Sequence, residues 1–424
     1  MPPGTTPHYV FIYFVLEDDF ISAVGKLGWP ELPDNNILDS INGPMRAQRY
    51  VGPDGKRQDT AHAYIHPKLG SGEFPNLHVL VETDVERVIV DDNKKAVSMV
   101  FRPSADFQPD SKQETRTVNA RKQAVLSAGA LGTPQILERS GVGNSEVLSR
   151  AGVPLVASVP GVGEKYLDHH IMLYPYKTSV GPDQTMDGIL TGRVNVAELI
   201  PKNDPLLSWN GVDVQCKLRP SDADIASLGT QFQAAWDKDF KNNPDKPLMI
   251  MSIVSCFPGD PSGVPAGQYM GIATFSTHPF SRGRVHITGP NFNDPAKIRR
   301  MDNFAGEIAA GHPEFPNGSK AAIIDAQPTS GAPPPHDIEY TPEDDPAINK
   351  FLKERISTTW HSMGTCKMAS FDDGGVVDPD LNVYGVKGLK IADLSIPPSN
   401  VGSNTCSVAM AIGEKAADII IREL

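Results

Sequence analysis

A short apolar run that ends in glycines and leads directly into a helical pattern constrains the fold of this chain more than any other feature. The run Ala-Val-Leu-Ser-Ala-Gly covers residues 124–129, and its unbroken apolar start is typical of a strand buried on both faces. Gly129 and Gly132 permit a tight turn, and we expect Thr133-Pro134 to begin a helix that ends near Ser140. A buried strand, a tight turn and a helix in this order predict an α/β fold.

Two further groups of elements flank this unit. Before it, β-rich runs at 77–81, 85–90 and 96–101 alternate with turn residues, which predicts a small β-meander. Near the C-terminus, residues 389–393 are expected to form a second buried strand, and residues 407–421 a helix with one broad apolar face. Because the end of the chain resembles the early α/β region, we expect both to belong to one domain.

The middle of the chain has a different pattern. Between about residues 171 and 355, prolines and acidic loops separate apolar runs, which predicts a second, mostly antiparallel sheet. The runs lie at 248–257, 269–277 and 284–288, and a helix is expected to begin at Pro342 to Asp345. We therefore predict an α/β chain, α+β overall, divided into residues 1–170, 171–355 and 356–424, with the first and last segments in one domain.

Charge and cysteine usage exclude several classes of protein. Lys and Arg total 39 against 51 Asp and Glu, and the net charge of −12 argues against a nucleic-acid partner. The four cysteines form no CxxC pair, so we expect free thiols and no metal site. The apolar run at 9–16 is too short for a membrane span and lacks a signal peptide's basic flank, and residues 422–424 do not form a peroxisomal address. We expect an intracellular protein without membrane association.

One histidine has a sequence context that suggests chemistry. His361 lies in Thr-Thr-Trp-His-Ser-Met-Gly-Thr, residues 358–365. A neutral imidazole accepts a proton near neutral pH, as oxidation of an alcohol requires. A single histidine is more often structural, and we treat four others as structural, namely His169, His170, His286 and His312.

Several passages together resemble the glucose-methanol-choline (GMC) oxidoreductase family. Residues 129–143 are similar to the family's second signature along their full length, and residues 160–169 resemble the segment that passes the flavin. The motif around His361 resembles the family's active-site segment, and the likeness extends from about residue 20 to the C-terminus. Passages at 278–283, 299–307, 337–340 and 382–390 are most similar to fungal short-chain alcohol (methanol) oxidases.

The resemblance implies a site and a cofactor. His361 and Asn404, 43 residues further on, match the family's catalytic pair, in which the amide anchors the substrate oxygen. FAD is the implied cofactor, held in a Rossmann-like domain beside a substrate domain built on an antiparallel sheet. The implied FAD contacts are Val85, Trp360, Asp393, Asn404 and Thr405.

The implied reaction is oxidation of a primary alcohol to an aldehyde by hydride transfer to the flavin. Oxygen, reduced to hydrogen peroxide, or another electron acceptor would complete the cycle, and assembly as a homo-oligomer stays open. No GxGxxG follows a strand near the N-terminus, so we expect the FAD-binding domain to be incomplete, lacking its N-terminal βαβ unit. Two alternatives are a truncated, cofactor-free inactive homologue and a lyase that uses the same histidine.

Overall fold

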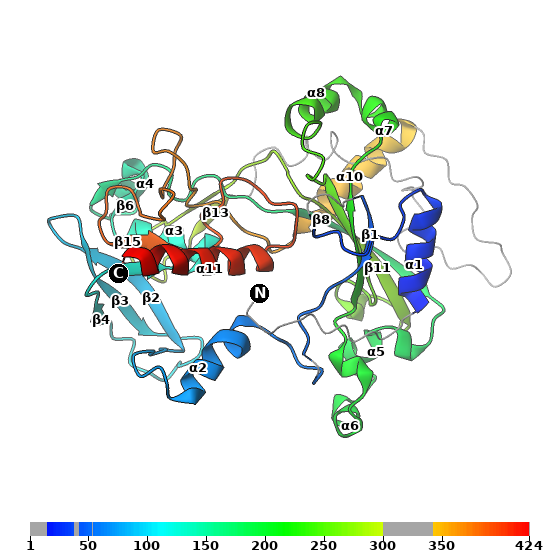
Figure 1. Ribbon diagram of the computed structural model, residues 1–424, viewed down its shortest axis with the longest axis horizontal. Helices are drawn as coiled ribbons and strands as arrows, with labels where there is room; N and C mark the ends of the chain where they lie inside the picture. The colour runs from blue at the N-terminus through cyan, green and yellow to red at the C-terminus, as the bar shows by residue number, and fades with distance from the viewer. Residues whose placement is uncertain (1–14, 38–41, 53, 300–341, 424) are drawn as a thin grey trace. The chain divides into compact units, whose positions relative to one another are not determined.

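The computed structural model describes residues 15–37, 42–52, 54–299 and 342–423. The chain forms two compact units, each assembled from separated segments: unit 1 from 1–78, 171–276 and 308–357, and unit 2 from 79–170, 277–307 and 358–424. The mixed helix and sheet content agrees with the predicted fold class (Figure 1). As a division into flavin-binding and substrate-binding parts, residues 1–170, 171–355 and 356–424 stay a prediction.

Unit 1 is built on an antiparallel sheet, as predicted for the middle of the chain. The strands follow the order β1-β9-β10-β11-β8-β14, and neighbours from β1 to β11 pair antiparallel. They are β1 (Gly43–Arg46), β8 (His170–Thr178), β9 (Val212–Leu218), β10 (Met249–Val254), β11 (Gln268–Ser276) and β14 (Ser357–Thr358). The sequence pattern did not reveal that β1, from the start of the chain, joins this sheet.

Unit 1 also contains seven described α-helices. They are α1 (Val15–Lys26), α2 (His66–Ser71), α5 (Asp187–Leu190), α6 (Val196–Leu199), α7 (Asp222–Ser227), α8 (Gly229–Asp239) and α10 (Asp345–Arg355). Short one-turn helices occupy 61–65, 182–184, 200–202, 205–208, 261–263 and 342–344. Phe20 and Val24 of α1 pack on Val214 and Met251 of the sheet, which buries the apolar face of the helix.

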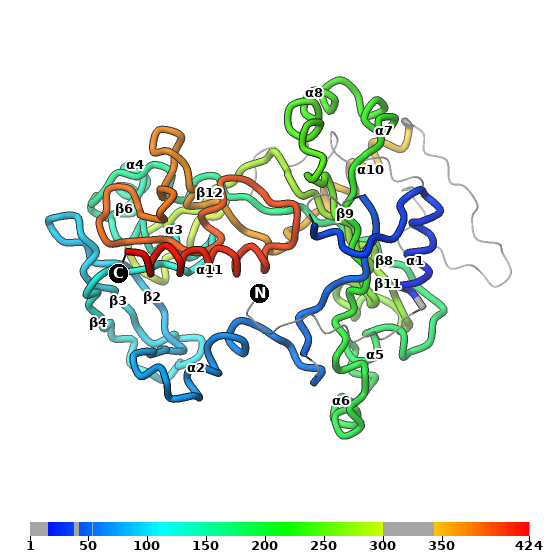
Figure 2. The backbone as a smooth tube through the Cα atoms, in the orientation of Figure 1, coloured from blue at the N-terminus to red at the C-terminus, as the bar shows by residue number. Residues whose placement is uncertain are grey.

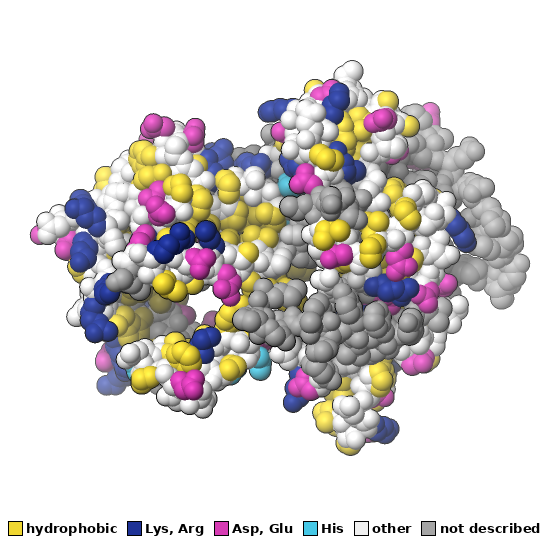
Figure 3. All heavy atoms as spheres, viewed as in Figure 1, with side chains coloured by type: hydrophobic (Ala, Val, Ile, Leu, Met, Phe, Trp, Pro, Cys, Tyr) yellow, Lys and Arg dark blue, Asp and Glu magenta, His cyan; other side chains and the backbone are white. Residues whose placement is uncertain are grey.

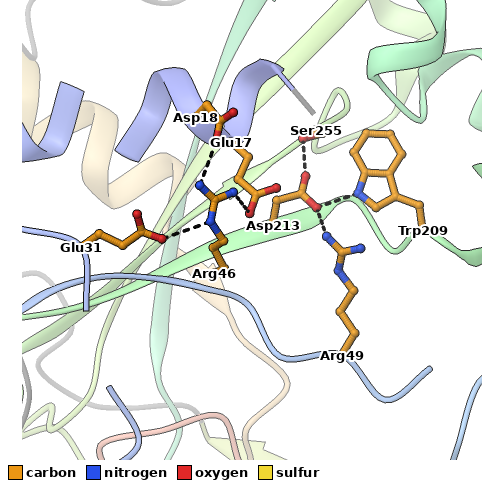
Figure 4. Close-up of polar contacts among 8 residues, drawn as sticks. All are labelled: Glu17, Asp18, Glu31, Arg46, Arg49, Trp209, Asp213 and Ser255. Carbon is orange, nitrogen blue, oxygen red and sulfur yellow. Dashed lines mark hydrogen bonds and ion pairs between the residues drawn. The ribbon is translucent and has the colours of Figure 1, made fainter. Parts of the chain in front are cut away.

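An arginine ties α1 to β1 in unit 1. Arg46 at the end of β1 forms ion pairs with Glu17 and Asp18 of α1, both at 2.8 Å, and with Glu31 at 3.1 Å (Figure 4). Burial raises the pKa of Glu17, and Arg46 acts in the opposite direction. Since Arg46 is 28% exposed and contacts three acids, we assign it a structural role.

A buried aspartate lies next to this cluster on β9. Asp213 accepts hydrogen bonds from Trp209 Nε1 at 2.7 Å and Ser255 Oγ at 3.0 Å, and pairs with Arg49 (Figure 4). Each oxygen of this fully buried carboxylate therefore has a partner, as a buried charge requires. The network fixes the strand rather than forming a site.

Unit 2 contains the predicted β-meander and the strand-turn-helix unit. Its strands are β2 (Thr83–Val90), β3 (Ala96–Pro103), β4 (Arg116–Asn119), β5 (Ala124–Leu126), β6 (Val142–Gly143), β7 (Ala157–Ser158), β12 (Arg284–His286), β13 (Lys297–Arg299) and β15 (Leu389–Ile391). Its helices are α3 (Gly129–Arg139), α4 (Ser145–Arg150) and α11 (Cys406–Glu423). β5 and β15 pair in parallel, as an α/β layer requires.

The core of unit 2 joins the early and late segments of the chain. Leu126 of β5, Leu137 of α3, Leu389 of β15 and Ile419 of α11 belong to one buried cluster. The backbone of α3 and α11 can be followed in Figure 2. Figure 3 shows charged side chains of both signs over the position of α11, beside apolar ones. The prediction that residues near 124 and near 390 belong together is confirmed by the pairing of β5 with β15.

Three local predictions in this region are wrong. Residues 77–81 form no strand, because no neighbouring strand pairs with them, and Leu80 and Val81 are 65% and 69% exposed. The run at 284–288 does not join the sheet of unit 1; β12 pairs with β13 in unit 2. Helix α3 begins at Gly129 rather than Thr133, so Pro134 lies inside it.

The described residues also bear on the expectations for cysteines and membrane spans. The four cysteines are free, as predicted. Within the described ranges, no helix has both the length and the apolar character that crossing a membrane requires. The passage at 337–340 and His312 lie outside the described residues.

Candidate active site

Two backbone segments of unit 2, almost 200 residues apart in sequence, build the site around His361. Leu167 and Met363 form an antiparallel bridge, with both N–H to carbonyl distances at 2.9 Å. This register places His169, two residues after Leu167, opposite His361, two residues before Met363. The regular spacing of an antiparallel ladder therefore places the two histidines opposite each other.

The turn after His361 depends on a glycine. Gly364 has a φ of +82°, a conformation that side chains rarely adopt. A Cβ added there would lie 2.8 Å from Leu167 Cδ1 and 3.0 Å from the Lys165 carbonyl oxygen. Only glycine lets the His-Ser-Met-Gly segment approach its partner segment this closely.

Asp168 holds both histidine segments through their backbones. Its Oδ1 accepts the N–H of His169 at 2.8 Å and the N–H of His361 at 3.1 Å. Its Oδ2 accepts the hydroxyl groups of Tyr166, at 2.9 Å, and Thr358. Since Asp168 is buried and hydrogen-bonded to both segments, it fixes the backbone positions from which the two imidazole rings extend.

The predicted catalytic pair comes together in this unit. The Nε2 of His361 lies 3.4 Å from the Nδ2 of Asn404, and Asn404 lies two residues before Cys406, where α11 begins. His361 is buried, whereas Asn404 is exposed. The pair therefore combines a sheltered imidazole with an amide that solvent and ligands can reach.

His169, which sequence reasoning treated as structural, contacts the predicted base. The Nδ1 atoms of His169 and His361 are 3.0 Å apart, and the two rings meet edge to face at 86°. The sequence did offer one signal for His169, because it lies in residues 160–169, the passage that resembles the family segment passing the flavin. The 167–363 register that makes the contact is a long-range pairing, which local patterns do not reveal.

Both rings are held in the neutral state. Burial, followed by the nearby His361, His278 and His170 side chains, lowers the pKa of His169 to about 3. Burial also lowers the pKa of His361 below its usual value, and Asp168 acts in the opposite direction. A neutral His361 has a ring nitrogen able to accept a proton at neutral pH.

The carboxylate of Asp393, a predicted FAD contact, joins β15 to α3. Its Oδ2 accepts from the N–H of Gly129 at 2.9 Å and the hydroxyl of Thr133 at 2.6 Å, and its Oδ1 accepts from the N–H of Ser395 at 2.7 Å. Because the carboxylate caps the amide of Gly129, the helix starts there, four residues before the predicted Thr133. Asp393 thus shapes the turn at the end of the two parallel strands.

The other predicted FAD contacts lie in three separate settings. Val85 is on β2 opposite Phe101, at a register shift, and is partly buried against the core. Thr405 accepts the N–H of Ala409 at 2.9 Å, the first turn of α11. Trp360, beside His361, is 79% exposed and has a φ of +58°.

The surroundings of His361 suit a flat, partly apolar ring system. Trp360 is its neighbour in sequence and offers an exposed aromatic surface, and Asn404 contacts its Nε2. Helix α11 begins two residues after Asn404. The first N–H groups of a helix have no acceptor within the helix and can therefore bind a negatively charged group. An isoalloxazine ring, apolar with a carbonyl edge that gains negative charge on reduction, fits these groups.

Comparisons with known proteins identify the family of the chain. Two models of GMC oxidoreductases match the chain, over residues 13–171 and 279–413. The alcohol oxidases of Pichia angusta and Candida boidinii are each 35% identical to the chain, over 96% of its length and 72% of theirs.

Solved structures share the fold at lower identity. The R554K variant of Aspergillus oryzae formate oxidase, studied for FAD modification, has a TM-score of 0.78 at 19% identity, covering 99% of this chain and 73% of its own. A fungal aryl-alcohol oxidase has a TM-score of 0.73 at 22% identity, with the same coverage. From the two family models and the alcohol oxidase relatives, the chain belongs to the GMC oxidoreductase family and is an FAD-dependent alcohol oxidoreductase.

Proposed function

We propose that this protein oxidises a primary alcohol to an aldehyde and that oxygen is its electron acceptor. The observation that carries the proposal is the neutral, buried His361, whose Nε2 faces an exposed amide at 3.4 Å. The alcohol oxidases among its relatives support the choice of substrate class and of oxygen. A primary alcohol has the small polar group that such a pair recognises.

The two side chains divide the work on the substrate. Asn404 Nδ2 donates a hydrogen bond to the carbinol oxygen and holds the carbinol carbon toward the cofactor. His361 Nε2 accepts the hydroxyl proton as the carbon–oxygen double bond forms. A hydride from the carbinol carbon would pass to the flavin when it is bound, and oxygen would be the final electron acceptor and give hydrogen peroxide.

Five residues would hold the cofactor. The backbone of Val85 would meet the adenine edge, and Asp393 would lie near the pyrophosphate and ribityl part, where it already orders the start of α3. Trp360 would contact the ring system, and the backbone of Asn404 and Thr405 would face its carbonyl edge. The last contact draws on the positive end of the α11 dipole.

The proposal is tested with the purified chain and a series of primary alcohols. We expect a flavin absorbance band that bleaches on anaerobic addition of the alcohol, with stoichiometric aldehyde, and hydrogen peroxide once air is admitted. A folded, colourless protein would favour the cofactor-free inactive homologue. A flavin that alcohols leave oxidised, together with cleavage of a cyanohydrin, would favour the lyase.

His361→Ala tests the base within the same experiment. We expect the rate constant of flavin reduction to fall at least about a hundredfold, the lower end of general-base effects. His62→Ala is the control. His62 is an exposed histidine of unit 1, and its replacement should leave the rate unchanged. A near-normal rate in His361→Ala would remove this residue from the mechanism.

A further inference from the structure

We infer that His169 is a positioning residue that holds His361 in the tautomer with an unprotonated Nε2. The inference rests on the proposed function of His361 as the base. It assigns a task to a histidine that the reaction itself does not require. The contact between the two Nδ1 atoms carries it, and that contact does not depend on a bound flavin.

A hydrogen bond between two neutral imidazoles has only two arrangements. The Nδ1 atoms of His169 and His361 are 3.0 Å apart, so one of them donates and the other accepts. If His361 donates, its own proton is on Nδ1 and its Nε2 is free to accept the substrate proton. If His169 donates, the proton of His361 is on Nε2, and the ring cannot act as a base toward the substrate.

The neighbouring groups favour the first arrangement. Asn404 points its Nδ2, a donor, at the Nε2 of His361 over 3.4 Å, and a donor suits an unprotonated nitrogen. A donor facing Nε2 leaves the proton of His361 on Nδ1, which orients the bond from His361 to His169.

The geometry of the pair is fixed by the backbone on both sides. Asp168 accepts the N–H groups of both residues, and Thr359 N–H donates to the His169 carbonyl at 3.1 Å. The ring planes are at 86° to each other, and the two rings approach through their Nδ1 atoms, which are 3.0 Å apart. A histidine that only filled space would not require this alignment of two ring nitrogens.

The charge state of the surroundings suits this task. The ionisable groups that act on the pair are Asp168, His170 and His278, in addition to the two rings themselves. His169 is 0% exposed, and its low pKa keeps its Nδ1 lone pair available at neutral pH. An imidazolium at this position would have no lone pair to offer and would repel a proton arriving on His361.

The first measurement needs no flavin and no substrate. With histidine labelled by nitrogen-15, the ring nitrogens report directly which atom carries the proton, and the His361→Gln spectrum identifies the His361 signals. We expect a protonated Nδ1 and an unprotonated Nε2 for His361 in the wild-type protein near pH 7. A wild-type His361 protonated at Nε2 overturns the inference, whatever the activity.

Two variants then test the cause. His169→Asn keeps an acceptor oxygen near the position of Nδ1, whereas His169→Phe keeps the ring shape and removes the acceptor. We expect His169→Phe to shift His361 toward the Nε2-protonated form and to reduce flavin at least about tenfold more slowly than His169→Asn. His62→Phe is the control, because it removes an exposed imidazole of unit 1 and should leave both the tautomer of His361 and the rate unchanged.

The outcomes separate this inference from the proposed function. An unchanged tautomer and an unchanged rate in His169→Phe overturn the role of His169 even if alcohols bleach the flavin. Absence of bleaching in every variant overturns the proposed function, while the nitrogen spectra still decide the tautomer. If His169→Phe does not fold, the wild-type and His169→Asn spectra decide.

Discussion

Two histidines of the same unit, one buried and one partly buried, have opposite charge states at neutral pH. His169 faces another imidazole, that of His361, and its pKa falls to about 3. His286 contacts two carboxylates, with its Nδ1 at 2.7 Å from Glu138 and its Nε2 at 3.5 Å from Glu164. Burial alone would lower the pKa of His286 as well, but the hydrogen bonds to these acids outweigh it and raise the pKa to about 9.

The comparison shows that burial keeps a histidine neutral unless carboxylate partners outweigh it. His286 is a fixed cation that joins β12 to the end of α3, since Glu138 also accepts the N–H of Ile287 at 2.8 Å. It cannot serve as a base at neutral pH because its lone pair is occupied by a proton. The pair of His169 and His361 stays neutral and therefore keeps an acceptor for chemistry.

The largest expected effect concerns the carboxylate partner of His286. Glu138→Gln should lower the free energy of unfolding by about 2–4 kcal/mol at pH 7, because charge-assisted bonds of a buried group are lost. Urea denaturation, with hydrogen exchange of the α3 amides, measures it. Glu146→Gln, at an exposed glutamate of α4, is the control and should change stability by less than about 0.5 kcal/mol. An unchanged midpoint of urea denaturation in Glu138→Gln would contradict the conclusion that Glu138 stabilises His286 as a cation.

Acidification should act on His169. Its folded pKa of about 3 lies below the unfolded value of 6.5, so the unfolded chain binds the extra proton as the pH falls below 6.5. Stability contributed by neutral His169 is therefore present above pH 6.5 and lost toward pH 3, by about 2–3 kcal/mol over the accessible range. Unfolding of the wild type and His169→Asn is compared at pH 7 and pH 4.5. The variant should lose less stability, and parallel losses would refute the assignment.

Alkaline pH should act on His286 in the opposite sense. Its folded pKa of about 9 lies above 6.5, so its contribution is complete below pH 6.5 and lost as the pH rises through 9. We expect a loss of about 1–3 kcal/mol between these values, reduced by partial solvent exposure. His286→Gln should flatten this part of the stability profile. A slope that survives the substitution would assign it to another group.

The smallest expected effect concerns the exposed partner of His361. Asn404→Ala should slow flavin reduction by about tenfold, roughly 1.4 kcal/mol, because one substrate hydrogen bond is lost. Stability should change by less than about 0.5 kcal/mol, since the side chain is exposed. Anaerobic stopped-flow and urea denaturation measure the two quantities, with Ser407→Ala as control. A stability loss without a rate effect would place Asn404 with the structural residues.

Local patterns predicted those elements whose residues determine their own conformation. The runs at 85–90, 96–101 and 124–126 lie in strands, and residues 407–421 lie in α11. The motif context also led to His361 and Asn404, whose side chains meet. Residues 77–81 had the composition of a strand but found no partner, which shows that β-propensity counts only where pairing occurs.

Contacts between distant segments were decided by the tertiary structure alone. The sequence by itself determined the α/β character, the antiparallel middle region and a histidine with a neighbouring amide suited to alcohol chemistry, because short-range periodicity and motifs carry that information. Which histidine is neutral and which is charged depends on the side chains packed around it, and the ring contacts a residue 192 positions away in sequence for His169 and 148 for His286. An isolated imidazole has the same intrinsic pKa everywhere, and only packing supplies the partner that shifts it.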